Sequence, residues 1–295
     1  MLDSDPGPTQ RVRVTEVRGD RSEDREDEAA AEEPLEIRVQ PGESAAAERY
    51  RIAVTMRTPG SDFELAAGFL FSEGLLHEPP ELQQIGYCMD PDEPQNHNIV
   101  VVTLRDGVPF DAERFRRNVY TSSSCGVCGK AAIEQVVVSV PHRPVGQFRL
   151  SSEVLSGLPE RIRTKQAVFG RTGGLHAAAL FRPDGTLVLL REDVGRHNAV
   201  DKLVGRRFLD GHLPESQAVL LVSGRASFEL VQKAAVAGIP ALAAIGAPST
   251  LAIRLAKEQG MTLIGFLREG RFNLYSGPER VALPAGGPPQ SVRGT

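Results

Sequence analysis

The chain has 295 residues, with 34 lysines and arginines, 38 acidic residues and three cysteines. This composition is typical of a soluble protein of one or two domains, and it excludes a scaffold held together by several disulfides. Residues 1–33 contain 11 of the acidic residues and five of the basic ones, which leaves 27 acidic and 29 basic residues for an almost neutral body. Broad attraction to nucleic acid or to an anionic membrane is therefore not expected.

The two ends of the chain predict disorder. Residues 1–33 are acidic and carry few large apolar side chains, so burial cannot offset the entropy of ordering them. Residues 284–295 are rich in proline and glycine, and we expect a second disordered tail there. No apolar run of about 18 residues predicts a membrane span, and residues 1–33 lack the apolar centre of a secretory signal. We therefore expect a cytoplasmic protein with reduced thiols.

Residues 34–120 predict a small N-terminal α+β domain. Apolar and polar residues alternate over 35–39 and 50–56, which is the period of half-buried strands, and the run at 98–104 indicates another strand. Residues 61–74 begin with the spacing of a capping box and continue as an amphipathic pattern, which predicts a short helix.

Residues 131–283 predict an α/β domain. Short apolar runs alternate there with helical patterns, in the order 218–222, 226–237, 239–245, 249–259 and 262–267. Such alternation is typical of βαβ units and indicates a mainly parallel sheet covered on both faces. Ahead of these units, a Pro-Asp-Gly turn at 183–185 indicates a hairpin, and a helix is expected from about 199 to 208.

The segment between the two domains, residues 121–130, is the most unusual of the chain. It contains Cys125 and Cys128 in a C-x-x-C surrounded by serine and glycine, and we expect it to be a mobile loop. A helix beginning near Lys130 would bring its N-terminal N–H groups close to both sulfurs. That setting favours an accessible, reactive thiolate.

Several interpretations of this cysteine pair compete. A structural zinc site needs four ligands, and only Cys88 and six scattered histidines remain to complete it. A dithiol oxidoreductase would place the pair directly after a strand, whereas a serine-rich loop precedes it here. A sulfur carrier needs one nucleophilic thiolate on a long loop, and the serine and glycine setting favours this hypothesis. Cys88 lies between Tyr87 and Met89 and is expected to be an ordinary buried cysteine.

Three turns in the second half could bind an anion, because each follows a strand and opens a helix. They are Glu192–Asn198, Ser223–Ser227 and Gly246–Thr250. The second of them begins with Ser223, Gly224 and Arg225. Serine and asparagine at such places can merely cap helices, but three turns together favour a ligand that carries phosphate. Four arginines could converge on that ligand, namely Arg196, Arg225, Arg268 and Arg271.

Two histidines lie near these turns, His176 and His197, and neither carries much weight alone. The surroundings of His176 are similar to the H-x-E of zinc deaminases, but position 178 is alanine and no P-C-x-x-C follows. Deaminase chemistry is therefore excluded. A P-loop nucleotide hydrolase is not expected either, because the chain has no G-x-x-x-x-G-K-[ST].

Seven segments together resemble the FdhD family of sulfur carriers, from about residue 34 to residue 275. They are PLEIRV (34–39), TMRTPGSDFELAAGFL (55–70), SSCGVCGK (123–130), TGGLHAAAL (172–180), EDVGRHNAVDKLVG (192–205), SGRASFELVQKAAVAGIPA (223–241) and APSTLAIRLA (247–256). The resemblance implies a three-layer, cytidine-deaminase-like C-terminal domain. It also implies a homodimer.

The activity implied by the resemblance is that of a sulfurtransferase required for formate dehydrogenase. Such a protein takes persulfide sulfur from a cysteine desulfurase and passes it to the molybdenum cofactor in its bis(molybdopterin guanine dinucleotide) form. The persulfide falls on Cys125, with Cys128 as a possible auxiliary. The cofactor-binding segment falls on Phe266, Leu267, Arg268, Glu269, Gly270 and Arg271.

Beyond the acceptor itself, the resemblance implies no permanent cofactor and no metal site. Arg196 and Arg225 are expected to help hold the nucleotide phosphates. The alternative hypothesis is a chaperone that binds the molybdenum cofactor without transferring sulfur.

Overall fold

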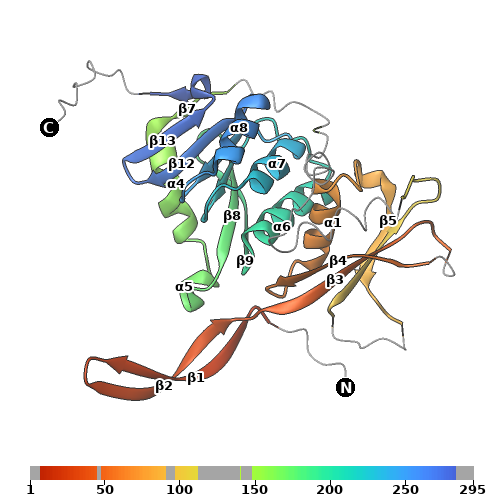
Figure 1. The fold of residues 1–295 in the computed structure, drawn as a ribbon, viewed down its shortest axis with the longest axis horizontal. Helices are drawn as coiled ribbons and strands as arrows, with labels where there is room; N and C mark the ends of the chain where they lie inside the picture. Colours follow the sequence, from red (N-terminus) through yellow and green to blue (C-terminus); the bar gives the residue numbers. More distant parts are fainter. Residues whose placement is uncertain (1–6, 45–47, 91–96, 112–139, 141–147, 284–295) are drawn as a thin grey trace.

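In the computed structural model, helices pack between and around a four-stranded and a six-stranded sheet (Figure 1). The structure describes residues 7–44, 48–90, 97–111, 140 and 148–283. Within these residues, no helix is long and apolar enough to cross a membrane.

The first half of the chain builds the four-stranded sheet, in the order β4-β3-β6-β5. Its strands are β3 (Glu33–Gln40), β4 (Tyr50–Arg57), β5 (Leu82–Tyr87) and β6 (Ile99–Leu104). The apolar residues that alternate along β3 are fully buried, as their period predicts: Leu35, Ile37 and Val39. A short 3-10 helix, η1 (Pro79–Glu81), precedes β5.

Helix α1 (Asp62–Ser72) confirms the helix expected over 61–74, but its predicted capping box is absent from this described helix. Ser61 adopts the left-handed conformation, with φ 58°, and its side chain makes no capping hydrogen bond. Glu64 instead accepts hydrogen bonds from the guanidinium of Arg191, at 2.6 and 2.8 Å. The Glu64 carboxylate forms an ion pair with Arg191 and therefore does not cap the start of α1.

The six-stranded sheet has the order β13-β12-β11-β10-β8-β9. Its strands are β8 (His176–Phe181), β9 (Leu187–Asp193), β10 (Val219–Val222), β11 (Ala241–Ala244), β12 (Thr262–Arg268) and β13 (Arg271–Ser276). β10, β11 and β12 are parallel, but the other pairings in the sheet are antiparallel. The prediction of a mainly parallel sheet is therefore wrong outside these three strands. β8–β9 and β12–β13 are hairpins, and a short turn can join only antiparallel neighbours.

Helices cover both faces of this sheet, which confirms a three-layer arrangement. The helices α6 (Arg196–Leu209), α7 (Phe228–Val236) and α8 (Thr250–Glu258) pack on the face that carries Leu180 and Leu220. Helix α4 (Ser152–Arg163) packs on the opposite face, against Phe181 and Leu221. The small elements α5 (Phe169–Thr172), β7 (Leu150–Ser151), η2 (Pro278–Arg280) and β14 (Val281–Ala282) complete this half.

The two halves share one hydrophobic core, which includes residues of α1, α6 and both sheets. Helices α1 and α6 lie side by side at its centre (Figure 1). They meet backbone to backbone at two glycines. A Cβ added to Gly68 would lie 1.9 Å from the carbonyl oxygen of Asp201, and one added to Gly205 would lie 1.8 Å from that of Glu64. Only glycine allows so close an approach.

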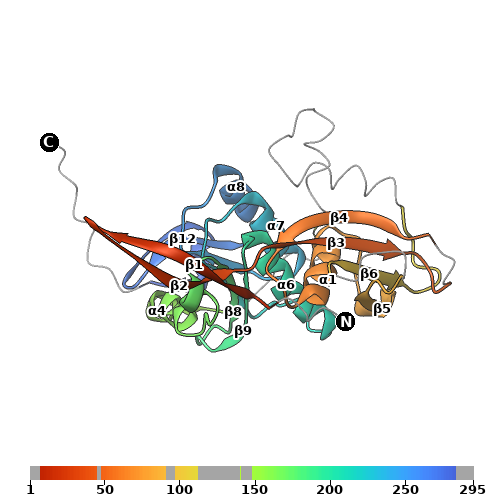
Figure 2. The ribbon, with the colours of Figure 1, turned by 90° about the horizontal axis from the view of Figure 1, so that it is seen from below.

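Residues 9–30 form an antiparallel hairpin of β1 (Thr9–Arg18) and β2 (Arg21–Ala30), where a disordered tail was expected. The hairpin projects from the molecule, with its base near α5 (Figures 1 and 2). Gly19, with φ 64°, begins the two-residue turn, and Arg25 forms ion pairs with Glu16 and Asp27. The high charge that predicted disorder is here spread in both signs along the two strands.

Candidate functional site

The carboxyl ends of β10, β11 and β12 meet at one edge of the six-stranded sheet, and the candidate site lies there. The N–H of Gly246 donates to the carbonyl oxygen of Gly224 at 2.9 Å, and the N–H of Phe266 donates to that of Gly246 at 3.0 Å. The expected turns at 223–227 and 246–250 are therefore neighbours, with the start of the 266–271 segment beside them.

Arg196 is the first residue of α6 and reaches the same place. A Cβ on Gly224 would lie 3.7 Å from Arg196 Cδ and 3.5 Å from Nδ1 of His176. Arg196 Nε is buried and has no hydrogen-bond partner among the described residues. A buried donor without a partner is costly unless a ligand completes it, and a phosphate oxygen is the natural acceptor for a guanidinium.

The electrostatics of the site favour an anion. Burial lowers the pKa of His176, and the positive charges of Arg196 and His197 lower it further. The surroundings of His176 therefore disfavour its protonated form. An added negative charge would relieve the same repulsion.

A second polar group beside the turn was not predicted from the sequence. His197 Nε2 lies 2.8 Å from Glu229 Oε2 and 3.2 Å from Ser227 Oγ. The hydrogen bond with His197 lowers the pKa of Glu229. The sequence indicated His197 through its place in the loop 192–198. Nothing in the sequence pointed to Glu229, which is the second residue of α7.

The six residues of the 266–271 segment differ in whether their side chains are exposed or buried. Phe266 has φ 53°, which is rare for a bulky residue, and the residue is 39% exposed. Leu267 is fully buried in the core on the α4 side, so its side chain is not available to a ligand. Arg268 donates to the carbonyl oxygen of Ile245 at 2.6 Å. Glu269 and Gly270 form the turn that leads to Arg271 at the start of β13.

Plain helix capping explains only part of the three turns. Ser249 caps α8, because its Oγ accepts from the N–H of Ala252 at 3.1 Å. The side chain of Ser227 does not cap the described helix α7, and it contacts His197 instead. Asn198 donates to the carbonyl oxygen of Met56 at 2.7 Å, in the other half of the chain. Two of the turns therefore present groups that capping does not account for.

The cysteine pair, Cys125 and Cys128, lies outside the described residues, as does the segment 121–130 that was expected to be a mobile loop. Cys88 confirms its prediction. It is a free thiol, 7% exposed, and it packs with Ile99 and Val101.

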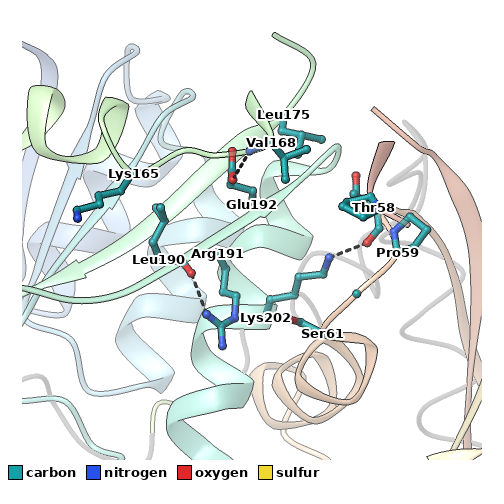
Figure 3. Close-up of a pocket in the computed structure, with 12 residues that line it drawn as sticks. Thr58, Pro59, Ser61, Lys165, Val168, Leu175, Leu190, Arg191, Glu192 and Lys202 are labelled. Carbon is teal, nitrogen blue, oxygen red and sulfur yellow. Dashed lines mark hydrogen bonds between the residues drawn. The ribbon is translucent and has the colours of Figure 1, made fainter. Parts of the chain in front are cut away.

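A separate cavity of about 270 Å³ lies between β9, the start of α5 and the Thr58–Ser61 turn (Figure 3). Two of the cations that line it are already paired. Arg191 binds Glu64, and Lys202 binds Asp193 at 2.7 Å. The edge of the sheet, with the unsatisfied Arg196 Nε, is therefore the better candidate for an anion.

Comparisons with known proteins cover nearly the whole chain. The model of the FdhD/NarQ family matches residues 30–282. The sulfur carrier protein FdhD of Streptomyces coelicolor is 53% identical over 281 residues, covering 94% of this chain and 97% of that protein. The protein of the same name from Mycobacterium tuberculosis is 45% identical over 275 residues, covering 91% and 97%.

A solved structure from Desulfotalea psychrophila, described as a formate dehydrogenase accessory protein, has the same fold. It superposes with a TM-score of 0.70 at 23% identity, and the match covers 93% of this chain and 99% of that one.

Proposed function

This chain belongs to the FdhD/NarQ family, and from that premise we propose that it is a sulfur carrier that serves formate dehydrogenase. It accepts persulfide sulfur from a cysteine desulfurase on Cys125 and passes it to the molybdenum cofactor, bis(molybdopterin guanine dinucleotide), which is its substrate. It acts in the cytoplasm as a homodimer. The observation that carries the proposal is the 53% identity, over 94% of the chain, to a protein named a sulfur carrier.

The loading step is an exchange between a thiolate and a persulfide. The thiolate of Cys125 attacks the outer sulfur of the desulfurase persulfide, and a new S–S bond forms. The bond between the two donor sulfurs breaks, and the donor cysteine leaves as a thiolate. Electrons balance without an added oxidant. Cys128 is assigned an auxiliary role in the transfer.

The candidate site fits the nucleotide part of the acceptor. Arg196 Nε offers a buried donor without a partner in the described chain, and Arg225 is exposed on the neighbouring turn. Helix N-termini and guanidinium groups are the usual ligands of a diphosphate. Phe266 is exposed and its main chain lies at the same edge, so its ring is a candidate to stack on a guanine base.

Sulfur transfer to Cys125 can be measured directly. After incubation with a cysteine desulfurase and cysteine, the intact mass of the protein is expected to rise by one sulfur atom. Cys125→Ala should lose this addition, whereas Cys88→Ala should keep it, because Cys88 is buried. An unmodified wild-type protein that still binds the cofactor would contradict sulfur transfer and favour the chaperone alternative.

A further inference from the structure

The end of β4 and the turn after it, at Thr58, join the N-terminal half of the chain to the 192–198 turn of the candidate site. We propose that Thr58 is a positioning residue, which fixes the start of α6 and thereby places Arg196 for the ligand. The inference rests on the proposed function, because it concerns binding of the same nucleotide.

The centre of this contact is the carboxylate of Asp193, which is completely buried at the end of β9. Its Oδ2 accepts from the N–H of Thr58 at 3.1 Å and pairs with Lys202 Nζ at 2.7 Å. Its Oδ1 accepts from the N–H of Gly195 at 2.8 Å and from Nδ2 of Asn198 at 3.1 Å. Four donors from two halves of the chain therefore hold one side chain.

Thr58 closes the arrangement from the other side. Its Oγ1 accepts from the N–H of Val194 at 3.1 Å. Its carbonyl oxygen accepts from Lys202 Nζ at 2.8 Å, as Figure 3 shows. Thr58 is 2% exposed, and so is Lys202. Removing one partner therefore leaves a largely buried polar group without its hydrogen bond in the protein.

The network ends one residue before Arg196. Val194 and Gly195 are held by Thr58 and Asp193 respectively, and Arg196 follows them as the first residue of α6. The turn is also packed closely, because a Cβ on Gly195 would lie 3.0 Å from Nδ2 of Asn198. A donor fixed before the ligand arrives loses little freedom on binding, which is how a preorganised site gains affinity.

The test uses guanosine diphosphate as the probe, with affinity measured by calorimetry on the full chain. Thr58→Val keeps the shape of the side chain but removes the acceptor for Val194, and we expect the affinity to fall about tenfold. Thr58→Ser keeps the hydroxyl and should bind like the wild type. Ser151→Ala is the matched control, because it removes a hydrogen bond of similar length at the start of the distant helix α4. It should leave the affinity unchanged.

Hydrogen exchange of residues 194–198 provides a second readout that needs no ligand. Exchange there should be faster in Thr58→Val than in Ser151→Ala or the wild type. Unchanged exchange, or unchanged affinity, in Thr58→Val would overturn the positioning role. If Thr58→Val does not fold, Thr55→Val removes the bond from Thr55 Oγ1 to Asn198 Oδ1, and a loss of about threefold is expected. A wild-type chain that binds no guanosine diphosphate would refute the proposed ligand. Hydrogen exchange would still show whether Thr58 fixes the turn at 194–198.

Discussion

At the scale of single residues, two side chains of the site, Arg196 and His176, would each gain from a bound anion. Arg196 Nε is buried without a partner in the described chain, and His176 lies beside it with a lowered pKa. Arg196 also contributes to the lowered pKa of His176, after burial. An anion bound there would accept from Arg196 and would stabilise the protonated form of His176.

This coupling predicts how affinity depends on pH. A bound anion raises the pKa of His176, so binding is coupled to uptake of a proton. The contribution of His176 to affinity should therefore increase as pH falls and the imidazole becomes protonated. The ratio of wild-type affinity to that of His176→Gln for guanosine diphosphate should therefore rise between about pH 8 and pH 5.5. Calorimetry at several pH values gives the ratio, and comparison with Gln cancels the titration of the nucleotide itself.

His212→Gln is the matched control for this measurement, because His212 is exposed beyond the end of α6. Its ratio to the wild type should stay constant with pH. If the ratio of wild-type to His176→Gln affinity is also constant with pH, the protonation of His176 is not coupled to ligand binding.

At the scale of elements, the sequence predicted those whose pattern was not interrupted. Helices α7 and α8 and strands β3 and β10 have clear apolar periods, and each lies where it was expected. Helix α4 was missed because Gly157 and Pro159 interrupt it, although Leu155, Leu158 and Ile162 still face the core. The β1–β2 hairpin was missed because its charges outweighed the weak alternation of Val12 and Val14.

The crossing of α1 and α6 gives a prediction at this scale. Gly205→Ala would place a methyl group within 1.8 Å of the carbonyl oxygen of Glu64, so the helices must separate. We expect a loss of about 3 kcal/mol or more in the free energy of unfolding, measured by denaturant titration.

The matched control is Gly157→Ala, another glycine inside a helix, where the nearest atom would be Arg161 Nε at 4.0 Å. Alanine is the better helix former, so a gain of up to about 1 kcal/mol is expected there. Equal effects at the two positions would contradict a backbone contact between α1 and α6.

At the scale of the whole molecule, the candidate site depends on contacts that no local pattern contains. The turns at 192–198 and 223–227 could be predicted because each follows a strand and opens a helix. The bond between Thr58 and Asp193 joins residues 135 positions apart, so it became visible only in the fold. The same holds for Glu229, because only the fold shows that it lies 2.8 Å from His197.

A buried charge cluster also joins the two halves. Lys233 of α7 binds Asp201 of α6 at 2.7 Å and lies 3.9 Å from Glu73, at the end of α1. Burial alone would lower the pKa of Lys233, but the carboxylates of Asp201 and Glu73 outweigh it and raise that pKa. Lys233 therefore remains charged at neutral pH, and its contribution to stability is lost only when pH rises through the raised value.

Folding favours the charged form of Lys233 but disfavours the charged form of Glu73. Burial raises its pKa more than Lys233 lowers it, so the folded chain holds the proton to a higher pH than the unfolded chain does. Folding then takes up a proton between the two pKa values, and stability falls as pH rises through that window. Glu73→Gln cannot lose a proton. Its free energy of unfolding should therefore gain on that of the wild type as pH rises from about 4 toward neutrality, in denaturant titrations at each pH. Glu258→Gln, at an exposed position of α8, should show no such gain, and a pH-independent difference for Glu73→Gln would contradict the raised pKa.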